Sequence, residues 1–360
     1  MYVSKHGTVA GGPPELVRRL LCQGASSYTL RSRHAEPRQG LGRKARVLAV
    51  VHGWMPSLAA GSERMMQHLL DALPRTEFEV AVLSFGIGGD HQDGEYYEYD
   101  GIPVFVGFGV PFPPDIIITH HGFAARVVQD ICQEWPDARV VSVYHNDRYN
   151  IPEIQDLKAE LEVFNTEWVK DSINHDSDSL TVHPPLDYDR HRVETTGGAV
   201  TLVNLQENKG VHLFARLANR FPDVPFLGVM GTHGTQEPIL APNALIHPVT
   251  QDMREVWRQT RVVLMPSEYE SYGMVAAEAC VNGIPVIANP TPGLVECLDY
   301  AGIFVPRDDT DGYERVLRLL LTDPEKYREH SKLAELRGLE LRSQTEIELS
   351  RFVERMRGLV

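Results

Sequence analysis

The chain has 360 residues, about twice the size of a typical single domain, so two domains are expected. Hydrophobic residues make up 42% and charged residues 23% of it, as in globular proteins, and no stretch reaches the roughly 18 apolar residues of a membrane span. The formal net charge of −14 disfavours binding of DNA or RNA over a broad surface, because neutralising phosphates requires a basic face.

Residues 1–45 form a basic leader ahead of the first apolar run. Residues 1–46 carry a charge of +7, from nine Lys and Arg against two Asp and Glu, which leaves −21 for residues 47–360. The leader lacks the apolar core of a signal peptide, which favours a cytoplasmic protein. We expect a solvated, partly disordered segment or an appendage, with contact to an anionic surface or nucleic acid as the alternative.

Short apolar runs then alternate with amphipathic segments. Strands are expected at residues 46–51, 79–85, 103–107, 115–119, 139–144 and 162–165. Helices are expected at residues 62–73, 123–135 and 167–175. Such alternation is typical of a parallel, doubly wound sheet, and it predicts a Rossmann-like N-terminal domain over residues 46–190.

The alternation breaks at Pro184-Pro185 and a polar stretch that is expected to link two domains. A second Rossmann-like domain is predicted over residues 191–325. Its strands are expected at 199–203, 226–230, 244–247, 261–265, 284–288 and 302–305. Residues 326–360 are assigned to C-terminal helices, with two helices expected at about 324–337 and 343–357, and their packing back on the N-terminal domain is left open.

The most informative segment is Pro266-Ser-Glu-Tyr-Glu270-Ser-Tyr-Gly-Met-Val-Ala-Ala-Glu278, which leads from an apolar strand through a Ser/Gly loop into a helix. The backbone N–H groups at the start of that helix, about Tyr272 to Val275, have no partner within the helix and suit a diphosphate. Glu278 lies one to two turns inside the helix, within reach of ribose hydroxyls. Glu270 precedes the helix and can reach past the phosphates to the group they carry.

This segment resembles the Glu-x7-Glu signature of the family 4 retaining glycosyltransferases, which have the GT-B fold of two Rossmann-like domains facing across a cleft. Glu270 and Glu278 have the required separation, and Gly-Ile-Pro-Val-Ile after the helix also matches. In that family the first glutamate contacts the donor sugar and the second binds the ribose. The resemblance implies a C-terminal donor domain and an N-terminal acceptor domain. The implied donor-site residues in this segment are Glu270, Ser271, Tyr272, Gly273, Met274, Val275 and Glu278.

Other loops resemble the same template. Lys209, in Val203-Asn-Leu-Gln-Glu-Asn-Lys-Gly, falls on the lysine that contacts the donor diphosphate, whereas Asn204 stands where the family has arginine. Gly231 belongs to a Gly-rich turn like the one that lies against the nucleotide base. Gly61 retains one glycine of the family's Gly-Gly-x-Glu loop, in which the other appears as Ala60.

Histidines follow two of the expected N-terminal strands. The strand Asp115-Ile-Ile-Ile-Thr-His120 resembles the family's strand that ends in a cleft histidine, and His121 and His145 are further candidates. A histidine at the carboxyl end of a strand can bond a sugar hydroxyl or steer the acceptor. The alternative is that His120 is a structural histidine whose ring nitrogens are hydrogen-bonded within the fold. In the other domain, the Gly293 amide is a further candidate contact to the donor.

Several motifs are absent from the sequence. It has no P-loop, no Gly-x-Gly-x-x-Gly after the first strand of either half, no Asp-x-Asp at a suitable strand end and no Cys-x-x-Cys pair. A P-loop ATPase and a dinucleotide dehydrogenase are therefore not expected. We expect no bound metal and no cofactor; a nucleoside-diphosphate sugar is the expected co-substrate. Whether it is of the UDP or the GDP type stays undecided.

The predicted function is transfer of a sugar from a nucleoside diphosphate to a hydroxyl acceptor by a metal-independent, retaining glycosyltransferase. Glu270, Lys209 and His120 are the predicted catalytic residues. One alternative is a non-catalytic nucleotide-sugar-binding scaffold, which Asn204 and the single glycine at Gly61 motivate. Another is a glycosyltransferase that acts on modified DNA bases and binds DNA through the basic leader, residues 1–45. The acceptor is not specified, and peripheral membrane contact stays open.

Overall fold

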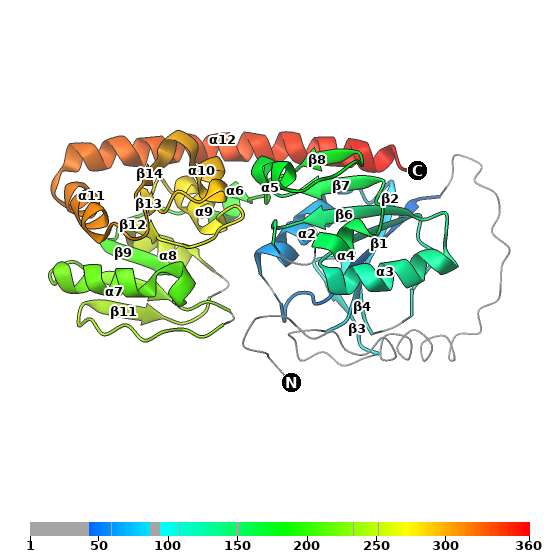
Figure 1. The fold of residues 1–360 in the computed structure, drawn as a ribbon, viewed down its shortest axis with the longest axis horizontal. Helices are drawn as coiled ribbons and strands as arrows, with labels where there is room; N and C mark the ends of the chain where they lie inside the picture. The colour runs from blue at the N-terminus through cyan, green and yellow to red at the C-terminus, as the bar shows by residue number, and fades with distance from the viewer. Residues whose placement is uncertain are drawn as a thin grey trace. The chain divides into compact units, whose positions relative to one another are not determined.

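The computed structural model describes residues 43–360 except 59, 87–93, 108, 149–150, 233 and 251, and the chain forms two compact units (Figure 1). Unit 1 comprises Met1–Phe164, Ile173–Thr181 and Ser350–Val360. Unit 2 comprises Asn165–Ser172 and Val182–Leu349. The expectations for the basic leader fall almost entirely outside the described residues.

Unit 1 is built on an eight-stranded sheet with the order β3-β4-β2-β1-β5-β6-β7-β8. The strands are β1 (Ala45–Val51), β2 (Phe78–Ser84), β3 (Tyr96–Tyr99), β4 (Ile102–Val106), β5 (Ile116–His120), β6 (Arg139–Tyr144), β7 (Leu161–Phe164) and β8 (Ser179–Thr181). Only the β3–β4 pair is antiparallel among these strands. The strand order reverses at β1, which has β2 on one side and β5 on the other, so the carboxyl ends of β1 and β5 lie together.

The described helices of unit 1 follow its strands in the βα pattern. They are α2 (Gly61–Ala72), α3 (Gly122–Glu134) and the short α4 (Ile151–Gln155). Leu48 and Val50 of β1 share a buried core with Val127 and Ile131 of α3. Strand residues that are apolar on successive positions are expected where helices cover a parallel sheet, and 47–51 of β1 are fully buried.

Unit 2 contains a six-stranded, all-parallel sheet with the order β11-β10-β9-β12-β13-β14. Its strands are β9 (Ala199–Val203), β10 (Phe226–Val229), β11 (Ala244–His247), β12 (Thr260–Met265), β13 (Val286–Ala288) and β14 (Gly302–Phe304). Its shorter helices are α5 (Glu167–Ser172), α6 (Tyr188–His191), η1 (Glu207–Lys209), α7 (Val211–Arg220), α8 (Arg254–Gln259), α9 (Met274–Val281), α10 (Pro292–Leu298), η2 (Asp299–Ala301) and α11 (Thr310–Thr322).

The two faces of the unit 2 sheet carry separate cores. Val262 and Leu264 of β12 pack with Phe214 of α7, whereas Val263 and Met265 pack in the core that contains α9 and α10. Successive side chains of a strand point to opposite faces, so β12 is buried on both sides. A sheet covered on both faces is the doubly wound arrangement that the sequence predicts.

The C-terminal segment differs from expectation. Instead of two helices, α12 is a single helix of 34 residues, Pro324–Arg357. The prediction of a break between residues 337 and 343 is wrong because Gly338 lies inside the helix, where α12 passes close to α9. A Cβ on Gly338 would lie 2.6 Å from the backbone oxygen of Cys280, so this glycine permits a close approach of two helices.

Candidate functional site

An ion pair joins two predicted donor-site residues of unit 2. Lys209 Nζ donates a hydrogen bond to Glu270 Oε1 at 2.5 Å, and Ser267 Oγ donates to the same oxygen at 2.8 Å. Lys209 ends η1, which follows β9, and Glu270 follows β12, the strand beside β9 in the sheet. The parallel sheet thus brings a cation and a carboxylate, 61 positions apart in sequence, to one edge, where a single ligand can contact both.

The turn that carries Lys209 is fixed by its neighbours. Arg307 donates to the backbone oxygens of Asn208, at 2.9 Å, and Glu207, at 2.6 Å. The backbone N–H of Glu268 donates to the Asn208 oxygen at 2.8 Å. These bonds connect η1 to the loop after β12, so Lys209 and Glu270 are positioned by one hydrogen-bonded unit before any ligand binds.

The loop between Glu270 and α9 presents the helix N-terminus. Gly273, with φ of 110°, precedes α9, which begins at Met274 rather than at the expected position near Tyr272. Trp168 Nε1 donates to the Ser271 carbonyl at 2.9 Å, and Asn165 Nδ2 donates to its hydroxyl at 3.2 Å. Ala276 and Ala277 donate to the Gly273 carbonyl oxygen at 2.9 and 3.1 Å, so the N–H groups of Met274 and Val275 are the ones suited to an anion.

Glu278, in α9, is a buried carboxylate with fixed orientation. Its side chain accepts a hydrogen bond from Trp257 Nε1 at 3.1 Å, and His191 Nδ1 lies 3.6 Å from the same oxygen, Oε2. The residue is only 9% exposed. The indole N–H and the imidazole therefore hold this carboxylate in place, and the sequence pattern did not indicate either partner.

Asn204 and Gly231 lie together at the carboxyl ends of neighbouring strands β9 and β10. Gln236 connects them: its Nε2 donates to Asn204 Oδ1 at 3.2 Å, and its Oε1 accepts from the N–H groups of Leu205 and Gly231 at 2.8 and 2.9 Å. Asn204 has φ of 71°, a left-handed conformation that asparagine tolerates better than arginine does. The change from the family's arginine therefore fits the local backbone.

Gly293 lies in the first turn of α10, directly behind the Glu270 loop. A Cβ there would lie 2.4 Å from the Glu270 carbonyl oxygen and 2.4 Å from the Ser271 carbonyl carbon. We expect Gly293→Ala to lower the free energy of unfolding by about 1–3 kcal/mol, because overpacking outweighs the roughly 1 kcal/mol that alanine gains in a helix. Urea unfolding measures this effect. Gly198→Ala is the control, since its Cβ would meet only Pro225 Cγ at 3.9 Å, and equal stability of the two variants would contradict the close approach.

Four histidines gather at the carboxyl edge of the unit 1 sheet. His120 ends β5 and is fully buried, and its Nδ1 lies 2.9 Å from Nε2 of His145, which follows β6. His52, after β1, and His121 complete the group, with His120–His121 ring centroids 4.3 Å apart. Burial lowers the pKa of His120 and His121 well below the ordinary value and that of His145 to about 3, so these three imidazoles are neutral at pH 7.

Beside these histidines is a buried glutamate of α2. Glu63 is 1% exposed and its Oε1 lies 3.6 Å from His52 Nε2, and burial raises the pKa of its carboxyl. Gly61 begins α2, and a Cβ there would meet no atom within 4 Å. The predicted site residues therefore form two sets: His120 and Gly61 in unit 1, and the others in unit 2. Glu63 was not predicted as a site residue, although a glutamate two positions after a loop glycine was visible in the sequence.

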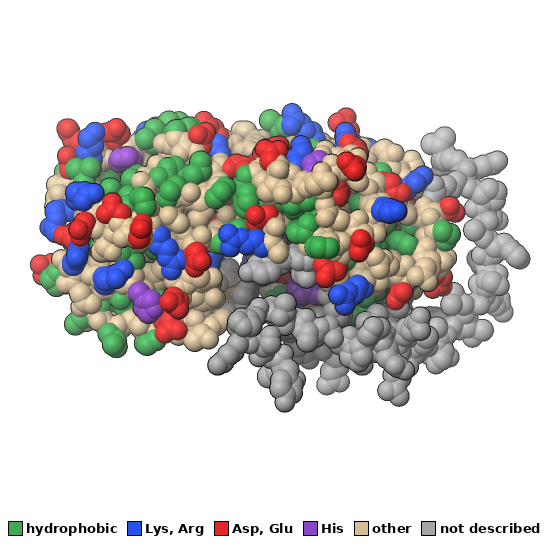
Figure 2. Space-filling view, in the orientation of Figure 1, with side chains coloured by type: hydrophobic (Ala, Val, Ile, Leu, Met, Phe, Trp, Pro, Cys, Tyr) green, Lys and Arg blue, Asp and Glu red, His purple; other side chains and the backbone are tan. Residues whose placement is uncertain are grey.

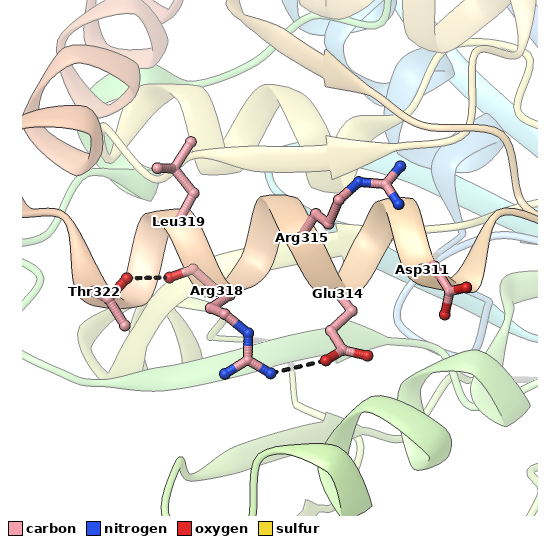
Figure 3. A pocket seen from close by; sticks show the side chains of 6 residues that line it. All are labelled: Asp311, Glu314, Arg315, Arg318, Leu319 and Thr322. Carbon is pink, nitrogen blue, oxygen red and sulfur yellow. Dashed lines mark hydrogen bonds and ion pairs between the residues drawn. The ribbon is translucent and has the colours of Figure 1, made fainter.

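Two surface features lie apart from these sets. Acidic and basic side chains are interspersed on the face that Figure 2 shows. A hollow on unit 2 is lined by side chains of α11 alone and contains none of the predicted site residues (Figure 3). Its lining residues are Asp311, Glu314, Arg315, Arg318, Leu319 and Thr322.

Among the described residues, no helix combines the length and apolar character needed to cross a membrane.

Solved structures with the same architecture are GT-B proteins. Sucrose-phosphate synthase from Thermosynechococcus elongatus aligns with 88% of this chain and 98% of its own, at a TM-score of 0.69 and 14% identity. HepE from Anabaena, solved in complex with UDP and glucose, aligns with 87% and 98% of the two chains, also at 0.69 and 14%. Likeness at this level of identity establishes the fold, and the predicted GT-B fold class is confirmed.

Sequence comparisons are more local. Residues 240–337 match the family described as Glycosyl transferases group 1. Over 80 residues the chain is 42% identical to the D-inositol 3-phosphate glycosyltransferase of Streptomyces bingchenggensis, a match that covers 21% of this chain and 18% of the relative. A relative with the same name from Corynebacterium urealyticum is 28% identical over 144 residues, 34% of each chain. The matches thus span between about a fifth and a third of these relatives and support a glycosyltransferase.

Proposed function

We propose that this protein is a retaining glycosyltransferase that transfers a sugar from a nucleoside diphosphate to a hydroxyl group, with no metal ion at the diphosphate. The observation that carries the proposal is the Lys209–Glu270 pair, in which Lys209 ends η1 and Glu270 lies in the loop that leads into the N-terminus of α9. A cation, a helix N-terminus and a carboxylate close together are suited to bind a diphosphate and the sugar attached to it.

In this mechanism the bond between the anomeric carbon and the diphosphate oxygen breaks, and the acceptor oxygen forms its bond on the same face of the sugar. The acceptor proton passes to the leaving diphosphate. Lys209 and the first N–H groups of α9 stabilise the charge that grows on this leaving group, while Glu270 orients the sugar. Glu278, held by Trp257, binds the ribose.

The acceptor is assigned to unit 1. His120 is fully buried and hydrogen-bonded to His145, whereas His121, at the edge of the sheet, is more exposed. We therefore assign His120 the role of a positioning residue that holds His121 in place. The UDP bound in HepE makes a UDP-sugar the first donor to test, and the names of the curated relatives make a phosphorylated inositol the first acceptor to test.

The experiment that tests the donor site is thermal-shift binding against a panel of nucleoside diphosphates and their sugars. A bound donor stabilises the chain by about 2.7 kcal/mol at a hundredfold excess over Kd. We expect one nucleotide to stabilise the wild type selectively and Glu278→Ala to lose this effect. Glu268→Ala is the matched control, because Glu268 lies near the same site but its side chain is 70% exposed. A folded wild type that no nucleotide stabilises would contradict the donor site.

A non-catalytic nucleotide-sugar-binding scaffold is the second candidate. Asn204 favours it, since the cation that the family places there is replaced by an amide bonded to Gln236. Donor binding without transfer to any acceptor and without hydrolysis would support the scaffold. Transfer of radiolabelled sugar to an acceptor, or its release by hydrolysis, would exclude it.

A further inference from the structure

The histidine group of unit 1 has the composition of a metal-binding site. His52, Glu63, His120 and His121 each offer one ligand atom, and these four atoms lie within 4.8 Å of one another. They come from three parts of unit 1 that the pairing of β1 with β5 brings together: the loop after β1, the first turn of α2 and the junction of β5 with α3. Three imidazoles and a carboxylate are a donor set typical of zinc and similar divalent transition metals.

His120 is the residue whose hydrogen bonding points most directly to a ligand. Its Nδ1 is engaged with His145 Nε2 at 2.9 Å, so Nε2 is the nitrogen that remains to bind a metal. That Nε2 is fully buried and has no hydrogen-bond partner within the described part of the chain. A buried polar atom without a partner is costly, and a bound cation would supply one.

The contact between His120 and His145 also has the form of an outer-sphere interaction. Metal-bound histidines usually donate their second ring N–H to a neighbouring acceptor, which fixes the orientation of the ring. With Nδ1 of His120 donating to His145 Nε2, the lone pair of His120 Nε2 is available to a cation. His145 is then a positioning residue rather than a ligand.

Two further observations agree with this assignment. His52 Nε2 and Glu63 Oε1 are 3.6 Å apart, near the roughly 3.4 Å between ligand atoms that bond lengths of about 2.0–2.2 Å give in a tetrahedral site. His121 has φ of 61° and ψ of 142°, a conformation that non-glycine residues rarely adopt and that tends to occur at functional sites.

We infer that His52, Glu63, His120 and His121 bind one divalent transition metal ion of the zinc class. With four protein ligands the site is closed, so its role is to tie the loop after β1 and the start of α2 to the β5–α3 junction. The inference goes beyond the proposed sugar transfer. Two of the ligands, His120 and His121, are those that the proposed function places on the acceptor side, but metal retention tests the site without any sugar transfer and without the donor residues of unit 2. It adds a metal that the sequence motifs did not predict.

The test uses the untagged full chain, stripped with a chelator, loaded with Zn²⁺ or Co²⁺ and desalted. Elemental mass spectrometry then counts bound metal, and the visible bands of Co²⁺ report the ligand geometry. We expect the wild type to retain one equivalent, with Co²⁺ bands of a four-coordinate site. His52→Ala and Glu63→Gln should lose the retained ion, and His145→Ala should bind it 10–100-fold more weakly.

The control is His212→Ala, which removes an exposed histidine of α7 and should leave the stoichiometry unchanged. Far-UV circular dichroism identifies variants that fail to fold, and Glu63→Gln, which keeps the shape of the side chain, retains the test if an alanine variant is lost. A wild type that keeps no metal after desalting would overturn the inference. Retention of a full equivalent by folded His52→Ala and Glu63→Gln would overturn it as well.

Discussion

Replacing Lys209 by alanine is expected to lower kcat for sugar transfer about 10²–10³-fold, the usual loss when one pre-organised charge contact to the transition state is removed. The leaving diphosphate gains negative charge as the anomeric bond breaks, and Lys209 Nζ is the side-chain cation next to Glu270. Because this charge is larger in the transition state than in the bound donor, kcat should fall more than KM rises.

The chain should stay folded in Lys209→Ala, since Glu270 keeps its hydrogen bond from Ser267 and Arg307 still holds the η1 turn. Steady-state transfer at saturating donor measures the effect. Lys209→Arg should restore part of the rate because it restores the charge. Lys332→Ala, which removes a 61% exposed lysine of α12, should have no effect. An unchanged kcat in Lys209→Ala would remove Lys209 from the proposed mechanism.

The part of the candidate site that could be predicted is the part that is local in sequence. Glu270 and Glu278 belong to one strand–loop–helix segment, so their spacing carried the prediction of a donor site. Lys209 is 61 residues from Glu270, and its place was predicted through resemblance to a family motif. The parallel order of β9 and β12 then accounts for the contact between them.

Contacts between side chains far apart in sequence could not be predicted. Gln236 connects Asn204, 32 positions away, to Gly231, but nothing in its own neighbourhood marks it as their partner. This contact exists because β9 and β10 are neighbours in the sheet, which brings the loops that follow them together. A single sequence specifies which segments become strands far better than it specifies which loops meet.

The fold was predicted where strands are apolar and missed where they are not. The strand β3, Tyr96–Tyr99, carries alternating exposed and half-buried side chains on an edge of the sheet, so no apolar run marks it. The three-residue strand β8, Ser179–Thr181, is similarly polar. Two helices were expected where α12 is one, and Gly338, between the two expected helices, packs closely against α9 inside it.

A buried network of charges in unit 2 leads to the second large expected effect. His183 Nε2 lies 2.6 Å from Glu296 Oε1 in α10, and its Nδ1 lies 2.9 Å from Glu348 Oε1 in α12. The two oxygens of Glu296 also accept backbone N–H groups of Glu167 and Trp168, at 2.7 and 3.1 Å. One histidine therefore connects α10, α12 and, through Glu296, the start of α5.

Burial by itself would lower the pKa of His183, but the hydrogen bonds that its ring donates to Glu296 and Glu348 outweigh burial and raise the pKa to about 9. For Glu296, burial favours the neutral form, yet the hydrogen bonds from His183 and from the two backbone N–H groups leave its pKa below the ordinary value. The network is therefore an imidazolium between two carboxylates at neutral pH.

The pH dependence of stability follows from these shifts. A group whose pKa is higher in the folded than in the unfolded chain stabilises fully below its unfolded value, here 6.5, and loses that contribution as the pH rises to about 9. At 1.36 kcal/mol per pKa unit, the contribution is on the order of 3 kcal/mol. The stabilisation is also lost at low pH, because protonation of Glu296 below its lowered pKa removes the charged partner of His183.

We expect His183→Gln to be about 3 kcal/mol less stable than the wild type at pH 6 and to approach it at pH 9 and above, since glutamine keeps a polar side chain but never carries the charge. Urea unfolding at the two pH values measures this gap. His212→Ala, an exposed histidine of the same unit, is the control and should show no pH-dependent difference. A gap between wild type and His183→Gln that stays constant from pH 6 to pH 9 would show that His183 acts through packing rather than through its charge.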